Sequence, residues 1–246
     1  MKAFLLFLFS CLTLSIHAQY LTVGLGTHIP VGAQKDRLKN AYGMTLGYEH
    51  AISKSPFYFV VDGSWSIFDL QTVKQDVEGP DGSITTQKIT YTSSIFNLTP
   101  GIGFAPLRHK KVSPYVAVKG GYAKYKTRMA LYDPEEDDGC HPLEEENILR
   151  DVTAVAVANG GVSVKVPACK KPFYFDLGAN YITGGRAEYL RMNKDENQPA
   201  AAEAAPHMVK FEHIQSGEVH EHSLGKVYTT KTSQLQFYIR IKIPIL

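Results

Sequence analysis

The sequence has little of what many function classes require. It contains one tryptophan and three cysteines in 246 residues, and its formal net charge is only +2. A balance this close to neutral predicts no special attraction to nucleic acid. No C-x-x-C spacing occurs, so neither a redox motif nor a zinc knuckle is indicated. There is no G-x-S-x-G signature and no glycine loop leading into a helix. We therefore expect no enzyme activity and no cofactor.

The one long apolar run lies at the start of the chain, in MKAFLLFLFSCLTLSIHAQ. Lys2 supplies a positive charge, an apolar segment follows, and Ala18 is a small residue at a plausible cleavage point. This pattern predicts a secretory signal peptide over residues 1–18 and a single domain over residues 19–246. No later segment is apolar enough for a membrane helix, so residence in a membrane would require a β-barrel.

Two cysteines, Cys140 and Cys169, remain after the predicted cleavage. An even number of cysteines in an exported protein predicts a disulfide between them. Two free thiols are the alternative.

Most of the chain alternates apolar and polar residues with a period of two, which indicates β-strands with unlike faces. In QLQFYIRIKIPIL, which ends the sequence, Ile239 and Ile241 oppose Arg240 and Lys242. Eight segments of this kind predict eight strands. They are residues 20–28, 41–50, 57–68, 89–104, 113–132, 173–181, 186–193 and 234–246.

The connections between these segments alternate in length. Those after the second, fourth and sixth segments are short, AISKSP, APLRHKKVSP and ITGGR, whereas the others are longer. This alternation is typical of outer-membrane barrels, which have short periplasmic turns and long external loops. On this interpretation the isoleucines of the last strand face lipid and its charges face the lumen. The same polar face carries charges of both signs, which we expect to form an ion-pair network inside the barrel. Its predicted members are Glu49, Asp62, Lys119, Asp176, Arg240 and Lys242.

Three features carry a resemblance to a known group of proteins: the signal peptide ending in HAQ, the strand sequences SPYVAVKGGY and PFYFDLGANY, and the final strand. The whole mature chain resembles small outer-membrane β-barrel proteins of the OmpA, OmpX and OmpW type, and the Bacteroidetes-type outer-membrane barrel domain. The resemblance implies an all-β fold, an eight-stranded antiparallel up-and-down transmembrane barrel. It further implies a monomer in the outer membrane of a Gram-negative bacterium, in contact with outer-membrane lipid after insertion by the barrel-assembly machinery.

The function that this resemblance implies is structural, or an interaction of the long loops with an external protein or glycan. One alternative is a narrow OmpW-like channel for ions or small apolar molecules. Another is a secreted soluble barrel that binds a ligand inside.

Two loop segments could bind metal, but a solvated loop is the simpler interpretation of each. DPEEDDGCHPLEEE, residues 133–146, gathers carboxylates that suit calcium but lacks EF-hand spacing. EVHEH places His220 and His222 on one side of a strand, and imidazoles suit zinc or copper. We predict no metal site and keep these two histidines as the weak candidates.

Overall fold

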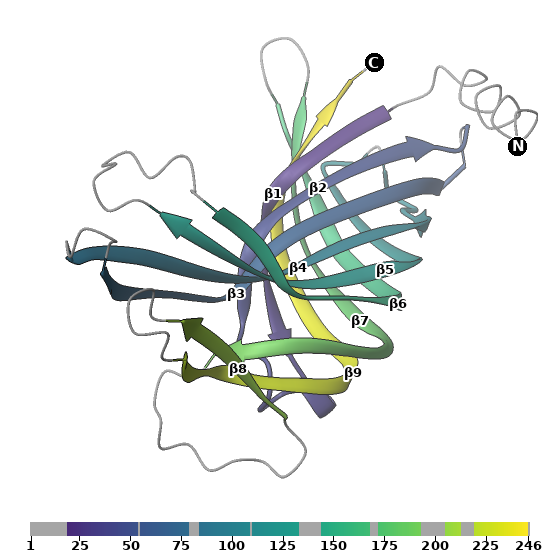
Figure 1. Cartoon of the computed structure of the whole chain (residues 1–246). Helices are drawn as coiled ribbons and strands as arrows, with labels where there is room; N and C mark the ends of the chain where they lie inside the picture. Colours follow the sequence, from purple (N-terminus) through teal and green to yellow (C-terminus); the bar gives the residue numbers. More distant parts are fainter. Residues whose placement is uncertain are drawn as a thin grey trace, which may run out of the picture.

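The computed structural model describes residues 19–53, 55–78, 84–108, 110–132, 144–167, 172–192, 205–212 and 219–245. These residues form nine strands and a one-turn 3-10 helix, η1 (Gly32–Gln34), which follows the first strand (Figure 1). The strands are β1 (Gln19–Pro30), β2 (Ala41–Ala51), β3 (Phe57–Glu78), β4 (Ile84–Phe104), β5 (Val112–Tyr132), β6 (Glu144–Val166), β7 (Phe173–Met192), β8 (Ala205–Glu212) and β9 (Val219–Pro244). Within this part of the chain, no helix is long and apolar enough to cross a membrane.

Eight of the strands close into a barrel. The strands pair in the order β1 to β7, then β9, and β9 pairs back to β1. Each of these pairings is antiparallel, and the contact that closes the ring runs from Tyr20 opposite Pro244 to Pro30 opposite Gln234. The predicted closed, eight-stranded, antiparallel barrel is therefore confirmed. The ninth strand, β8, pairs only with β9 and lies outside the ring.

The prediction for the sixth and seventh strands was wrong. Residues 144–166, which lie in a predicted long connection, form β6. The two segments 173–181 and 186–193 belong almost entirely to one strand, β7. The glycines of ITGGR suggested a turn, but they lie at a break in register between Thr183 and Arg186, inside β7. A pair of glycines accommodates such a β-bulge as readily as it does a turn.

The strand β6 lies between the two cysteines of the predicted disulfide in the sequence. Cys140 and Cys169 themselves lie outside the described residues. They flank β6, whose first residue, Glu144, pairs with Leu131, and whose Val164 pairs with Val112 at the opposite end of β5. The connections that hold the two cysteines therefore leave β6 from its opposite ends. The structure does not describe either cysteine, so the disulfide between them stays a prediction.

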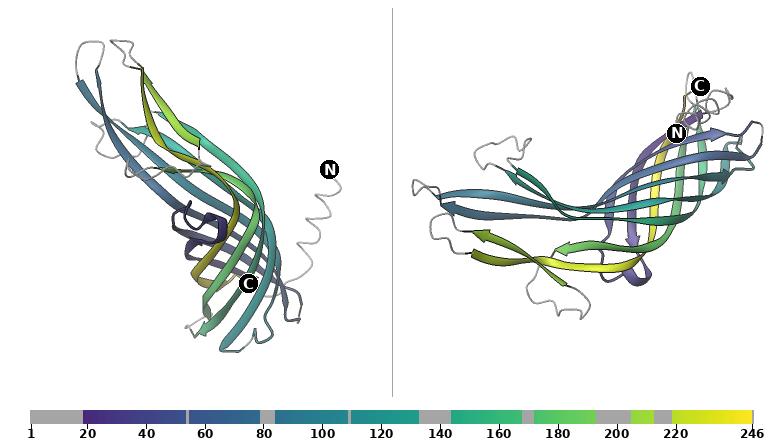
Figure 2. Two further views of the ribbon diagram at one scale, coloured as in Figure 1. Left: turned by 90° about the horizontal axis from the view of Figure 1, so that it is seen from below. Right: turned by 45° about the vertical axis from the view of Figure 1, so that its right-hand side comes forward.

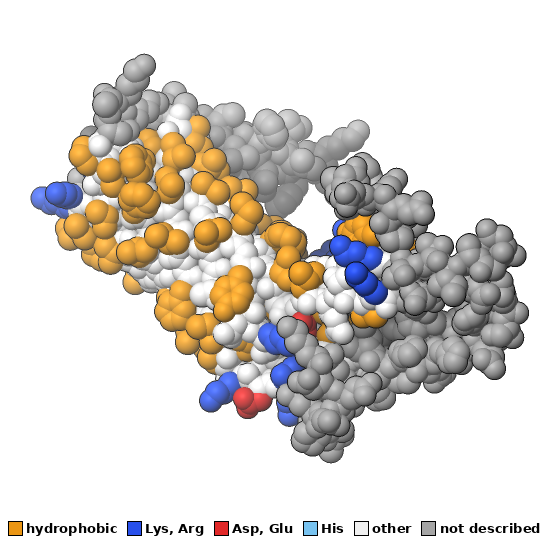
Figure 3. Space-filling view, turned by 90° about the vertical axis from the view of Figure 1, so that its left-hand side faces the viewer, with side chains coloured by type: hydrophobic (Ala, Val, Ile, Leu, Met, Phe, Trp, Pro, Cys, Tyr) orange, Lys and Arg blue, Asp and Glu red, His pale blue; other side chains and the backbone are white. Residues whose placement is uncertain are grey.

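The two faces of the barrel wall point as the sequence predicts. Ile239 and Ile241 are 50 % and 40 % exposed, whereas Arg240 and Lys242 are 3 % and 8 % exposed. Other apolar residues on the same outer face are also exposed, and together they cover the barrel as a broad apolar surface (Figure 3). They include Leu25, Tyr42, Met44, Leu46, Phe57, Phe59, Trp65, Val116, Val118, Leu177 and Phe237.

Six strands continue well beyond the ring and form an extension at one end (Figure 2). β2 leaves β3 at the pair Tyr42–Ile67, and β6 leaves β7 at the pair Val155–Gly184. Past these points the wall separates into one arm made of β3 to β6 and a second made of β7, β9 and β8. Asp151 bridges the base of the gap, because its Oδ2 accepts a hydrogen bond from the backbone N–H of Glu188 at 2.7 Å.

An apolar core holds the two arms together. Ile89 and Tyr91 of β4 pack against Leu190 and Met192 of β7, and all four side chains are buried. A bulge after Ile67 directs two consecutive residues, Phe68 and Asp69, inward. Five partly buried apolar residues pack against the cluster of Ile89, Tyr91, Leu190 and Met192, namely Met129, Leu131, Ile148, Leu149 and Val227.

Candidate functional site in the barrel interior

Charged side chains fill the end of the barrel nearest Gln19 and Ile245, the first and last described residues. The Lys242 ammonium forms a salt bridge with Glu49 Oε2, and both side chains are buried. Arg108, from the connection between β4 and β5, lies with its Nη2 3.8 Å from the same carboxylate oxygen. Its guanidinium also lies over the rings of Tyr20 and Tyr58, at 5.4 and 5.2 Å from their centroids. Two cations and two aromatic rings thus surround one carboxylate.

A second ion-pair cluster lies further along the interior. Asp62 accepts from Lys119 Nζ at 2.6 Å and from Arg240 Nη1 at 2.8 Å, so that each carboxylate oxygen has a cation. Lys119 also donates to Asn180 Oδ1 at 3.1 Å. These side chains come from β3, β5, β7 and β9, so the cluster spans the interior from wall to wall. Buried charges need such paired and hydrogen-bonded surroundings.

The structure does not bring the six predicted charges into one network. Glu49 and Lys242 form one cluster, and Asp62, Lys119 and Arg240 form the other. Asp176 joins neither cluster by a hydrogen bond. It is fully buried, and its two carboxylate oxygens have no hydrogen-bond partner among the described residues. Sequence reasoning also missed Arg108, because its position in a short connection gave no sign that its side chain enters the barrel.

Two tyrosines meet in the middle of the interior. The hydroxyls of Tyr115 and Tyr238 lie 2.9 Å apart, and Asn159 Nδ2 donates to the Tyr238 hydroxyl at 2.7 Å. Space for these rings comes from glycine. A Cβ at Gly161 would lie 2.5 Å from the Tyr115 hydroxyl, and one at Gly178 would overlap the hydroxyl of Tyr238.

Neutral polar side chains form the next layer. Gln34, from η1, enters the barrel and is fully buried. Its Nε2 donates to the Tyr125 hydroxyl at 3.2 Å, and Gln234 Nε2 donates to the same oxygen at 2.9 Å. His28 Nδ1 lies 3.0 Å from Gln234 Oε1. The connection between β1 and β2 thus reaches back into the interior, which the sequence did not predict.

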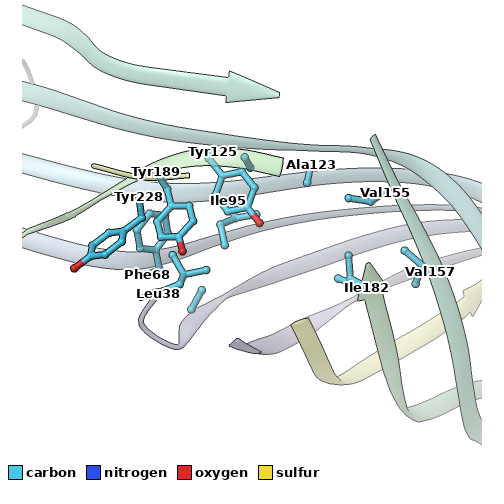
Figure 4. Packing of buried hydrophobic residues seen from close by; sticks show 12 residues of the cluster. Leu38, Phe68, Ile95, Ala123, Tyr125, Val155, Val157, Ile182, Tyr189 and Tyr228 are labelled. Carbon is cyan, nitrogen blue, oxygen red and sulfur yellow. The ribbon is translucent and has the colours of Figure 1, made fainter. Parts of the chain in front are cut away.

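Aromatic rings fill the mouth where the barrel meets the extension. Tyr189 lies 5.7 Å from Tyr125 and 6.1 Å from Tyr228 between ring centroids, and Phe68 meets it edge-on at 6.4 Å (Figure 4). Leu38 belongs to the same buried cluster. These side chains come from both arms, so they also join β3 and β5 to β7 and β9.

Two small cavities lie among these layers. One cavity, beside Arg108, Glu49 and Lys242, has a volume of about 10 Å³. Another, beside Asp62 and Arg240, has about 20 Å³. Each is comparable with the space that one water molecule needs. Within the described residues, the interior is therefore a packed polar core.

The weak metal candidates gain no support from the geometry. In the part of the chain that the structure describes, no group of three or more His, Cys, Asp or Glu residues could hold a metal ion. The backbones of His220 and His222 lie in β9, opposite Phe211 and Val209 of β8, but their side chains lie outside the described part. Residues 133–143 of the acidic segment are also outside it.

Comparison with known proteins identifies similar shapes but no family. The chain matches no family model, and a search of curated proteins finds no match. Ail of Yersinia pestis, solved with the heparin analogue sucrose octasulfate, is 13 % identical with a TM-score of 0.40, over 93 % of this chain and 100 % of that one. Neisserial surface protein A is 10 % identical with a TM-score of 0.43, over 92 % and 96 %. A major outer membrane protein of Thermus thermophilus is 14 % identical with a TM-score of 0.39, over 93 % and 100 %.

Proposed function

We propose that this chain is a non-catalytic β-barrel of a Gram-negative outer membrane, whose extension contacts an external protein or glycan. The observation that carries the proposal is the inverted distribution of polarity across the barrel wall. The outer face of the wall is apolar and exposed, whereas ion pairs and amides are buried inside. Outer-membrane barrels have this arrangement, and soluble barrels the opposite one.

Strand length supports the same proposal and accounts for the extension. A membrane-crossing strand needs about 9–11 residues. β1 and β2, with 12 and 11 residues, match that length. β3 to β7 and β9 have 20 to 26 residues, about twice what a crossing needs. The surplus residues build the extension, which on this proposal projects outside the cell. Gln19 and Ile245, the first and last described residues, lie at the other end of the barrel, which would face the periplasm.

The packed interior favours a plugged barrel over a narrow channel. The two ion-pair clusters, the tyrosine pair and the aromatic mouth occupy successive levels, and the two cavities beside the ion-pair clusters have volumes of about 10 and 20 Å³. We expect no steady conductance from the purified protein in planar lipid bilayers. A reproducible single-channel current would contradict the plugged interior but not the membrane location.

The location is tested with membranes from an expressing Gram-negative cell. The outer-membrane fraction is run on a denaturing gel, boiled and unboiled. We expect the chain in that fraction and a band that moves on heating, because compact barrels resist detergent until they are heated. A soluble product without a heat shift would reject the proposal. A ligand held inside a soluble barrel would then be sought.

A further inference from the structure

Cations lie directly opposite one another at several places in the extension. Lys126 of β5 pairs with Arg150 of β6, and Arg186 of β7 pairs with Lys231 of β9. Such directly paired residues have Cβ atoms only about 5 Å apart, and like charges in this arrangement destabilise a sheet. Further along the first arm, Lys74 of β3 pairs with Lys88 of β4 in the same way.

In the part of the chain that the structure describes, the fold provides no ion-pair partner for the first two pairs. Among the described residues, no carboxylate lies within 4 Å of the charged groups of Lys126, Arg150, Arg186 or Lys231. Glu145, on the same face, is paired with Arg128 at 3.2 Å. Arg150, Arg186 and Lys231 are exposed, and Lys126 is partly exposed. The repulsion within each pair therefore points to an anion from outside the chain.

Both pairs lie just beyond the apolar surface of the barrel, on the side of the extension. On β6, the next outward residue toward the barrel from Arg150 is Val152, which is exposed. On β5, Tyr122 is the last exposed apolar residue before Lys124 and Lys126. On β7, Tyr181 precedes Arg186 in the same way. Space-filling shows lysine and arginine mainly at the margins of the apolar surface (Figure 3).

We infer that the pairs Lys126–Arg150 and Arg186–Lys231 form a binding collar for the phosphate groups of lipid headgroups. These lipids belong to the leaflet at the end of the barrel that carries the extension. This inference rests on the proposed membrane location. Guanidinium groups bind phosphate oxygens in pairs, and an adjacent ammonium adds a second charge. The apolar residues below each pair would contact the acyl chains of the same lipids.

The positions of the pairs favour lipid over a soluble polyanion. One pair lies on β5 and β6 and the other on β7 and β9, on the two sides of the gap between the arms. A planar layer of headgroups surrounds the barrel and reaches both pairs at once. The pairs also lie next to the apolar surface, where headgroups would be, rather than only at the outer end of the extension.

The test uses the full chain folded in zwitterionic detergent micelles. Bisphosphorylated lipid A is added, and bound lipid is counted by native mass spectrometry. The variants are Lys126→Gln with Arg150→Gln, Arg186→Gln with Lys231→Gln, and all four together. The matched control is Lys110→Gln with Lys111→Gln, two cations at the opposite end of the barrel. Phosphatidylcholine, inorganic phosphate and dextran sulfate serve as separate probes.

We expect each double variant to bind lipid A about 25-fold more weakly than the unchanged chain. Each cation lost at an anionic lipid surface weakens binding by about fivefold, and each double variant loses two cations. The control variant and Lys126→Arg with Lys231→Arg should bind like the unchanged chain. Equal binding by the fourfold variant, or an equal loss in the control, would overturn the inference.

The remaining probes separate the sources of the anion. Saturation by inorganic phosphate at the same concentrations would replace the headgroup with a free-phosphate site and overturn the lipid assignment. Preference for dextran sulfate would overturn it in favour of a soluble polysaccharide. Each variant is also checked for its heat shift on gels. A normal heat shift with unchanged lipid binding rejects only the collar, whereas absence of any heat shift in the unchanged chain rejects the membrane barrel.

Discussion

Arg240 donates to Asp62 at 2.8 Å across the barrel interior, although the two residues are 178 positions apart in the chain. Both side chains are buried, and Lys119 completes the cluster at 2.6 Å from the same carboxylate. The charges of Lys119 and Arg240 are thus compensated largely by one residue.

Replacing Asp62 is therefore predicted to destabilise the barrel strongly. Asp62→Asn leaves two buried cations without a carboxylate, and breaking a buried ion pair costs about 3–5 kcal/mol. The free energy of unfolding is measured from urea titrations of the folded chain in detergent micelles. Glu145→Gln, which removes a partly exposed partner of Arg128, is the control and should cost about 1 kcal/mol or less. Equal effects of the two variants would contradict the cluster.

The interior glycines are predicted to be intolerant of side chains. Gly178→Val places its side chain against the Tyr238 hydroxyl and should destabilise the barrel by about 1–3 kcal/mol, which is typical of overpacking. Gly120→Val is the matched control, because a Cβ there meets only Val155 O, at 3.9 Å. The temperature at which the gel band shifts measures both. A tolerated Gly178→Val would show that the tyrosine pair can move aside.

Charges on the outer face are predicted to disturb assembly. Ile239→Arg or Ile241→Arg should destabilise the membrane-inserted barrel by about 2–4 kcal/mol, because arginine would face the middle of the hydrocarbon layer. Thr229→Arg, at an exposed position of β9 in the extension, should have little effect. The readout is the fraction of heat-shifted protein after folding into lipid vesicles. Full assembly of Ile239→Arg would mean that this face meets water.

The single tryptophan offers a direct measurement of lipid contact. Trp65 is 48 % exposed on the outer face, where it pairs with Met44 and Phe96. Phosphatidylcholine brominated on its acyl chains should therefore quench most of its fluorescence in vesicles. The variant Trp65→Phe gives the background signal. Emission that brominated and ordinary lipid leave equally bright would place Trp65 away from the membrane.

The alternation of apolar and polar residues predicts most strands of the barrel wall. It fails where the residues on the two faces of a strand differ little in polarity. In β6 the outward positions Ala154, Ala156 and Ala158 alternate with the inward positions Val155 and Val157. Both sets are apolar, so the two faces resemble each other and the segment does not stand out as a strand with unlike faces. The pattern from Thr153 to Val166 is still period-two, and that signal could have identified the strand.

The interior was predictable in its charges but not in their pairing. Alternation alone places Asp62, Lys119 and Arg240 on the inner face. Which cation meets which carboxylate depends on the register and tilt of strands that are distant in sequence. Gln34 and Arg108 come from connections, where no periodicity applies, and only the closed structure reveals that they point inward.

The continuity of the long strands has a mechanical consequence. β3 to β7 and β9 run from the barrel into the extension as single elements, and the arms are fastened to each other by the aromatic mouth and by Asp151. The described part of the extension is therefore a rigid continuation of the barrel wall rather than a flexible tether. Binding of a partner to it costs little conformational entropy of the chain, but the binding surface cannot move far from the barrel to reach a partner. Two such molecules can engage one ligand together only by drifting laterally until they stand side by side.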